Sequence, residues 1–357
     1  MQPIFRVLLL AGSGGAKQAT DLTPLLADRL LTLRITDKAG LDSDELDISL
    51  DDRDGAVRLP DTGAVLEVSL GYAETGLTRI GQYRIDEVGS SGMPQTVTLR
   101  GRPANMLGAI RQARRHAWSN CPLEQIVRDI AQRNKLKPVC KVKATVVRAD
   151  QMNESDLHFL TRLARQYDAT ATIKGGQVLV LPRGGQRNSR SGKPLPTLVL
   201  QRRDISHWQF LRSDREAAGG AAVRSHDQRS GKTQLVMVPD KNNPDAPPRY
   251  IRHPVASKGG ASAAAKATAN RARRAEFTLN LSLPGRADIV AERTLRAQGI
   301  KEGVDGLWTV DSVVHNLSRS GWDTALTLVI NKKTPHKAGR KVKKTKQPGV
   351  VLTPTPL

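Results

Sequence analysis

The chain is poor in cysteine: 357 residues include Cys121 and Cys140 and no other. These two residues are far apart in the sequence, and neither has another Cys or a His at the spacing of metal ligands. A disulfide framework and a zinc site are therefore both excluded as the basis of the fold. The low cysteine content is typical of a protein made in a reducing cytoplasm.

Aromatic residues are also scarce, at 3% of the chain. We therefore expect cores built mainly from Leu, Val, Ile and Ala. Proteins that bind single-stranded nucleic acid usually stack the bases on aromatic side chains, so the low aromatic content argues against that class.

Long apolar runs are absent as well. Val7–Ala11 is an apolar run of five residues after Arg6, shorter than the core of a signal peptide. No stretch approaches the roughly 20 apolar residues that span a bilayer. We expect a protein that is soluble when made and does not enter a membrane by itself.

What the chain does have is positive charge, with a net charge of +22. Eight Lys or Arg residues lie between Asn331 and Lys346, and no acidic residue follows Asp323. The rest of the excess is spread along the chain, as on a solvated surface or a charged channel wall. We favour a solvated or partner-facing tail over a dedicated nucleic-acid clamp, which remains the alternative.

The first hundred residues are predicted to be antiparallel β, because apolar and polar residues alternate in short segments bounded by turn residues. The alternation is found at Leu33–Ile35, Leu46–Leu50, Leu66–Leu70, Tyr83–Ile85 and Val97–Leu99. Five or six such strands indicate a barrel or sandwich.

The middle of the chain has a different pattern. A helix is predicted to begin at Pro122, with apolar residues from Leu123 to Ile130 on one face, and to end near Asn134. Ala171–Leu181 is predicted to form a hairpin that turns at Gly175 and Gly176. This block is α+β.

After an exposed connection at Arg183–Pro196, strand patterns resume. We predict strands at Leu198–Leu200, Leu235–Val238, Phe277–Leu283, Trp308–Val314 and Leu326–Ile330.

Two segments interrupt this second β unit, and one segment follows it. Pro239–Pro254 contains five prolines and is predicted to be a mobile surface loop. Ala261–Glu276 is predicted to be an Ala-rich helix with a basic face formed by Arg271, Arg273 and Arg274. After Ile330 the apolar periodicity ends, and we expect disorder.

Segments that could form a catalytic or ligand-binding site match the known motifs poorly. Gly12–Lys17 lacks the Ser or Thr that follows the lysine of a phosphate loop, and Asp51–Gly55 has ligands out of register for calcium, so we interpret both as turns. The seven histidines never form a close pair, and His158 and His315 are expected to be packing or surface residues. We predict no enzyme activity, no cofactor and no metal site.

The most informative stretch is Gln151–Ala164. Ser155 or Asn153 can cap the first free amides of a helix, while Glu154 and Asp156 place negative charge at the positive end of its dipole. Apolar residues then recur on one face. By itself this pattern indicates no more than a docked amphipathic helix.

The same stretch resembles the Glu-Ser-Asp signature of the phage late control D family, the baseplate hub proteins of contractile tails and related injection machines. The resemblance assigns Glu154, Ser155, Asp156, Phe159 and Arg162 to a structural signature rather than a catalytic one. Other blocks resemble the family in the same order along the chain: Asp21–Leu30, Leu46–Gly55, Gly81–Val88, Ser191–Pro196 and Trp308–His315.

The resemblance implies a mainly β fold with two tail-tube-like β-barrels and a small α+β insertion. We assign residues 1 to 105 to the first barrel, 106 to 189 to the insertion, 190 to 332 to the second barrel, and 333 to 357 to a basic tail. Arg215–Gly220 lacks the aromatic expected there, Gly299–Lys301 has Ile where an aromatic is common, and the basic tail has no clear counterpart in the family.

The implied function is a structural hub of the tail baseplate, found in the virion and made in the host cytoplasm. Three copies would join the sixfold tail tube above to the threefold spike below, beside neighbouring baseplate proteins. Their central channel would pass DNA or tape-measure protein. Two other classes remain open: a basic nucleic-acid-binding protein, and a cell-wall-acting enzyme of the injection machine.

Overall fold

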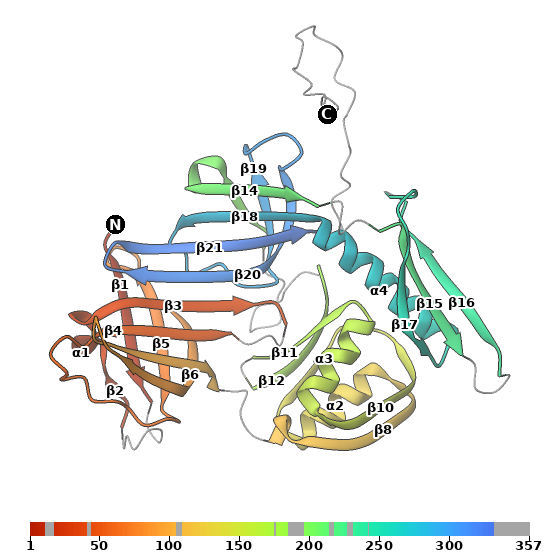
Figure 1. Cartoon of the computed structure of the whole chain (residues 1–357), viewed down its shortest axis with the longest axis horizontal. Helices are drawn as coiled ribbons and strands as arrows, with labels where there is room; N and C mark the ends of the chain where they lie inside the picture. The colour runs from red at the N-terminus through yellow and green to blue at the C-terminus, as the bar shows by residue number, and fades with distance from the viewer. Residues whose placement is uncertain are drawn as a thin grey trace, which may run out of the picture.

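The computed structural model describes residues 1–10, 18–40, 44–104, 109–174, 176–184, 196–213, 218–226, 231–241 and 243–331. The fold is mainly β, as predicted (Figure 1). Its largest element is a 13-stranded sheet. Eleven strands follow one another across it: β14 (His207–Arg212), β18 (Phe277–Pro284), β21 (Gly321–Ile330), β20 (Gly306–Ser318), β3 (Leu30–Lys38), β4 (Glu45–Asp51), β7 (Thr96–Pro103), β6 (Gly76–Ser91), β5 (Val65–Tyr72), β1 (Pro3–Leu9) and β2 (Thr20–Asp21).

Two further strands, β13 (Leu198–Gln201) and β19 (Thr294–Gln298), extend the sheet from β20. Short helical turns lie beside the sheet or lead into the next block: α1 (Thr23–Ala27), η2 (Ala109–Arg111) and η3 (Arg202–Asp204). The sheet has two apolar cores, one mainly among the strands from the first hundred residues, with Leu317 and Trp322 added, and one among the strands after residue 197. The antiparallel pairing of β3 with β20 joins these two parts.

The two parts contain the same four-stranded set, arranged head to tail. In the first part the spatial order is β3, β4, β7, β6, and in the second it is β14, β18, β21, β20. In each set, the first two strands along the chain occupy the first two positions of the sheet. The third strand along the chain occupies the fourth position, and a hairpin returns the chain to the third. All neighbours are antiparallel, so equivalent strands also run in the same direction.

The residue pairing inside the two sets is equivalent too. A row of paired residues crosses each set: Leu33, Ile48, Leu99 and Val88 in the first, and Trp208, Leu281, Leu326 and Val313 in the second. β20 therefore corresponds to β6 with an offset of 225 positions, as from Val88 to Val313. β14 corresponds to β3 with an offset of 175, as from Leu33 to Trp208.

The equivalence extends to sequence and local backbone. Two segments of eight residues share a pattern, Gly81–Val88 and Gly306–Val313. In both, position one is Gly, position three is aromatic, position five is a β-branched aliphatic residue, position six is Asp and position eight is Val. In both strands the ladder shifts by one residue at that aspartate, Asp86 in β6 and Asp311 in β20. A shared β-bulge at the same place is a built feature of a strand, because it re-aims the chain on either side.

The α+β block lies between the two sets in the chain and packs as a layer of its own. Strands β8 (Ala113–Pro122) and β10 (Thr145–Ser155) pair with each other, and β11 (Ala169–Lys174), β12 (Gln177–Pro182) and β9 (Lys137–Cys140) form a second small sheet. Helices α2 (Leu123–Arg133) and α3 (Asp156–Gln166) bury their apolar faces against these strands. α2 has Pro122 as its N-cap and Asn134 as its C-cap, so it begins and ends where predicted.

A fourth unit interrupts the second set between β14 and β18. Its strands β15 (Gly220–His226), β16 (Thr233–Pro239) and β17 (Arg249–Val255) form a separate three-stranded sheet. Its long helix α4 (Lys258–Glu276) packs on that sheet through alanines and also contacts α3 (Figure 1). The second β unit is therefore more elaborate than its strand pattern suggests.

Two sequence-based expectations for this unit were wrong. Pro239–Pro254 is not loop throughout, because β17 begins at Arg249 and pairs in parallel with β15. β17 is an edge strand with a register shift before Val255, a setting that tolerates the missing amide of Pro254. Arg274 does not belong to an exposed basic face: it is 8% exposed and bound to Asp168.

Each strand predicted by alternation is present, although Leu235–Val238 lies in the separate sheet as part of β16. Asp51–Gly55 closes β4 as a turn, and the Asp54 carboxylate binds the Arg29 guanidinium through two contacts of 2.7 Å. Within the described residues, no helix combines the length and apolar character that crossing a bilayer requires. Gly12–Lys17, Ser191–Leu195, most of the Arg183–Pro196 connection and the basic tail at 333–357 fall outside the described ranges.

Candidate functional site

The predicted signature lies where β10 turns into α3. Ser155 is the last residue of the strand and the N-cap of the helix, and its Oγ accepts a hydrogen bond of 3.2 Å from the His158 amide. Just before it, the ladder with β8 shifts by one residue between Met152 and Glu154, and Asn153 has a φ of 52°. The cap predicted for Ser155 is confirmed, while Asn153 supplies the left-handed turn instead.

Glu154 holds the outer side of this junction. Its Oε1 accepts a hydrogen bond of 2.5 Å from Arg162 Nη2, and its Oε2 lies 2.8 Å from His158 Nδ1. Arg162 Nη2 also donates to the Asp150 carbonyl at 2.8 Å. Burial acts to raise the pKa of Glu154, but the Arg162 and His158 contacts outweigh it and the pKa is lowered. Glu154 therefore ties the end of β10 to the second turn of α3.

Asp156 holds the inner side of the junction, and its side chain is fully buried. Its carboxylate accepts hydrogen bonds from Gln151 Nε2 at 2.9 Å, Asn134 Nδ2 at 2.8 Å and Arg133 Nη1 at 3.2 Å. A buried carboxylate is tolerated only when donors of this kind replace its water shell. Asp156 thus links β10, α3 and the end of α2.

Phe159 and Arg162 extend the junction toward β8. Phe159 is fully buried and stacks on Trp118, with 4.9 Å between ring centroids. The Arg162 guanidinium lies over the Phe159 ring, 5.3 Å from its centroid. Trp118 donates from Nε1 to Asp129 on α2 at 2.9 Å. Each of the five signature side chains therefore contacts its own α+β block, and the arrangement is that of a structural junction.

Sequence reasoning missed the partners of the signature. Trp118, Arg133, Asn134 and Gln151 complete the buried cluster, but they come from β8, α2 and β10. Gln151 lies within the stretch Gln151–Ala164, and this position was the one signal available in the sequence. The described residues contain no group of three or more His, Cys, Asp or Glu side chains placed to hold a metal ion.

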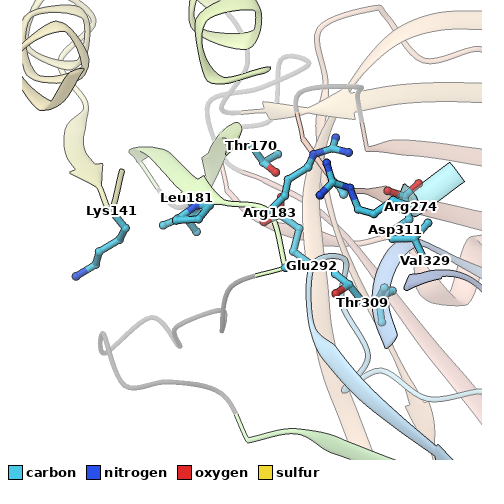
Figure 2. Close-up of a pocket in the computed structure, with 13 residues that line it drawn as sticks. Lys141, Thr170, Leu181, Arg183, Arg274, Glu292, Thr309, Asp311 and Val329 are labelled. Atoms are coloured by element: carbon cyan, nitrogen blue, oxygen red, sulfur yellow. The ribbon is translucent and has the colours of Figure 1, made fainter. Parts of the chain in front are cut away.

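A second feature lies where the α+β block meets α4 and the sheet. A cavity of about 370 Å³ is open there, lined by residues of β11, β12, α4 and the strands around β20. Figure 2 shows the guanidinium groups of Arg183 and Arg274 close together in this cavity, with Glu292 and Asp311 on its sheet side. Beside it lies a smaller cavity of about 220 Å³ that shares these two arginines.

The overall fold is that of a phage tail protein. The 43 kDa tail protein of prophage MuSo2 from Shewanella oneidensis has the same fold, with a TM-score of 0.67 at 14% identity, covering 91% of this chain and 98% of that chain.

The sequence then narrows the class. Residues 43–321 match the family model described as phage tail baseplate hub (GPD). The probable baseplate hub protein of Escherichia phage 186 is 34% identical over 353 residues, covering 87% of this chain and 90% of that protein. The corresponding protein of Escherichia phage P2 is 32% identical over 352 residues, with coverages of 87% and 90%. The chain belongs to the phage tail baseplate hub family, which confirms the predicted family and its place in the virion tail.

Proposed function

We propose that three copies of this chain form a ring that joins the sixfold tail tube to the threefold spike and lines the central channel. The observation that carries this proposal is the repeated four-stranded set. Two head-to-tail repeats per chain give six equivalent units in three chains, so one ring can match both symmetries. A head-to-tail interface closes into a ring when its rotation permits.

The junction inside the chain supplies a template for the junction between chains. The second half of β20 pairs with β3, seven residue pairs from Ser312 with Lys38 to Ser318 with Thr32. The equivalent strands are β6 and β14. Within the described residues β14 pairs only with β18, and β6 after Ile85 pairs only with β7, so both have an edge open for a partner. Open strand edges readily pair with another chain.

The offsets between the repeats give the register of this pairing. Asn316 pairs with Arg34 inside the chain, so Ser91 of one copy is expected opposite Gln209 of the next. In the same register Val88 lies opposite Arg212, which brings the basic end of β14 beside the acidic pair Asp86 and Glu87. The charges at the two edges are thus complementary, which favours this pairing over like-charged alternatives.

Cysteine cross-linking tests the register. Opposed residues of antiparallel strands have Cα atoms about 4.5–5.5 Å apart, within the range that a disulfide spans. The variant carrying Ser91→Cys and Gln209→Cys is expected to form covalent dimers and trimers under oxidation, with no larger species. Each single-cysteine variant should form neither covalent trimers nor larger cross-linked species.

A control pair, Ser91→Cys with Gln234→Cys on β16, places the second thiol outside the large sheet and should not cross-link in this pattern. Equal cross-linking of the two pairs, or a monomeric mass for the full chain alone and with spike protein, would remove the ring proposal. Excess Arg and Lys in the channel would give weak, nonspecific binding of DNA that falls with salt, in contrast to a dedicated nucleic-acid-binding protein.

A further inference from the structure

Four arginines from two helices and one connecting segment line the smaller cavity between the α+β block and α4. Arg165 lies in the last turn of α3, Arg183 follows β12, and Arg271 and Arg274 lie one turn apart on α4. One acidic residue, Asp168, shares the lining. Four guanidinium groups against one carboxylate leave an excess of three positive charges around about 220 Å³.

The single carboxylate is already engaged. Asp168 Oδ1 accepts a hydrogen bond of 2.6 Å from Arg274 Nη2, and Oδ2 accepts one of 2.8 Å from Asn270 Nδ2. The last turn of α3 adds a weak partner, since the Arg165 carbonyl lies 3.5 Å from Arg271 Nη2. Among the described residues that line the cavity, Asp168 remains the one negative charge beside the four arginines.

Arg274 provides the second observation. The residue is 8% exposed, yet its Nη1 is buried without a hydrogen-bond partner. A buried guanidinium N–H without an acceptor is costly, because it has lost water and gained nothing in exchange. Arg274 therefore combines a buried, unused donor with a place in the lining of an open, positively charged cavity.

The neighbouring positive charges also act on Arg271. The pKa of Arg271 is lowered, first by loss of solvent and then by the charges of Arg183, Arg165 and Arg274. This direction is what like charges held close together produce. Glu292 and Asp311 line the adjoining larger cavity and not this one.

We propose that this cavity binds a polyvalent oxyanion, of which inorganic phosphate is the simplest, and that the anion ties α4 to the α+β block. Planar guanidinium groups bind phosphate oxygens through paired hydrogen bonds, and several of them can share one tetrahedral anion. The bound anion accepts from Arg274 Nη1 and separates the facing arginines. The site belongs to a single chain and does not depend on the ring.

Calorimetric titration of the full chain with inorganic phosphate, at ionic strength held constant with NaCl, tests the site. We expect saturable binding with one anion per chain, and a rise of the unfolding temperature that NaCl alone does not give. The variant carrying Arg183→Gln and Arg271→Gln keeps the Arg274–Asp168 pair and should bind phosphate at least tenfold more weakly. A matched variant, Arg111→Gln with Arg296→Gln, removes the same charge from exposed positions and should bind as the wild type does.

Three outcomes would overturn the proposal. The first is a phosphate effect equal to that of NaCl at the same ionic strength. The second is an equal loss of affinity in the matched variant. The third is displacement of phosphate by a short oligonucleotide at lower phosphate-group concentration, which would assign the site to a nucleic-acid backbone. If the Arg183→Gln, Arg271→Gln variant does not fold, phosphorus NMR of the wild type provides the test. Binding broadens and shifts the phosphate resonance in a saturable way, and absence of binding leaves the resonance unchanged.

Discussion

Gln151 Nε2 donates a hydrogen bond of 2.9 Å to Asp156 Oδ1, and neither side chain is exposed to solvent. The two residues belong to β10 and α3 and lie five positions apart. Their contact links β10 to the first residue of α3. We therefore propose that the signature motif of this chain helps to determine the fold of the α+β block.

Asp156→Ala is expected to destabilise the protein strongly. The substitution leaves donors of the half-buried Arg133 and Asn134 and of the buried Gln151 without this acceptor. Removing one partner of a buried ion pair costs about 3–5 kcal/mol. Urea unfolding followed by circular dichroism measures the loss. The control is Asp150→Ala, whose carboxylate pairs with the exposed Arg148 and should contribute about 1 kcal/mol or less. Similar losses for the two variants would contradict the role given to Asp156.

Ser155→Ala is expected to weaken the start of α3. The variant loses the Oγ that accepts from the His158 amide, an interaction that contributes about 1 kcal/mol in typical helices. Ser155→Thr is the matched control, because threonine retains the hydroxyl and also caps helices. The free energy of unfolding should fall for the alanine variant and change little for the threonine variant. A threonine variant as unstable as the alanine variant would argue against capping as the cause.

His315 should make the protein less stable in acid. It lies in β20, is 2% exposed and contacts Thr324 Oγ1 at 3.1 Å. Burial lowers its pKa from 6.5 to about 4. The folded state then binds fewer protons than the unfolded state, so this contribution is complete above pH 6.5 and is lost as the pH falls toward 4. The loss amounts to about 3 kcal/mol.

Chemical unfolding of the wild type and of His315→Gln between pH 4 and 7.5 checks this expectation. The variant cannot titrate at this position, so its stability should fall less steeply over the acid part of the range. His207→Gln, at an exposed position of β14, is the control and should follow the wild-type slope. Identical slopes for wild type and His315→Gln would show that another group causes the acid sensitivity.

The alternation of apolar and polar residues predicted the strands that bury one face. It did not predict strands without that pattern. Leu46–Leu50 and Phe277–Leu283 alternate clearly, and both are central strands of the large sheet. β8 was missed because its sequence is mostly polar and it buries Trp118 alone among its ten residues. β17 was missed because its proline is tolerated only at an edge, and an edge is a property of the sheet rather than of the segment.

The candidate site was predicted in part. Ser155 could be read as a helix cap because capping is local, three residues from donor to acceptor. The burial of Asp156 could not be read, because its partners Arg133 and Asn134 come from a helix more than twenty positions earlier. Interactions between residues close in the sequence could therefore be predicted, whereas contacts between distant residues could be identified only from the structure.

The pairing of β3 with β20 has a consequence for biosynthesis. β3 ends at Lys38 and its neighbour begins at Gly306, so a nascent chain completes the first strand long before the second leaves the ribosome. At 5–20 residues per second the wait is on the order of tens of seconds. During this interval the edge of β3 that later pairs with β20 has no partner strand, and a chaperone or a neighbouring nascent chain can reach its hydrogen-bonding groups.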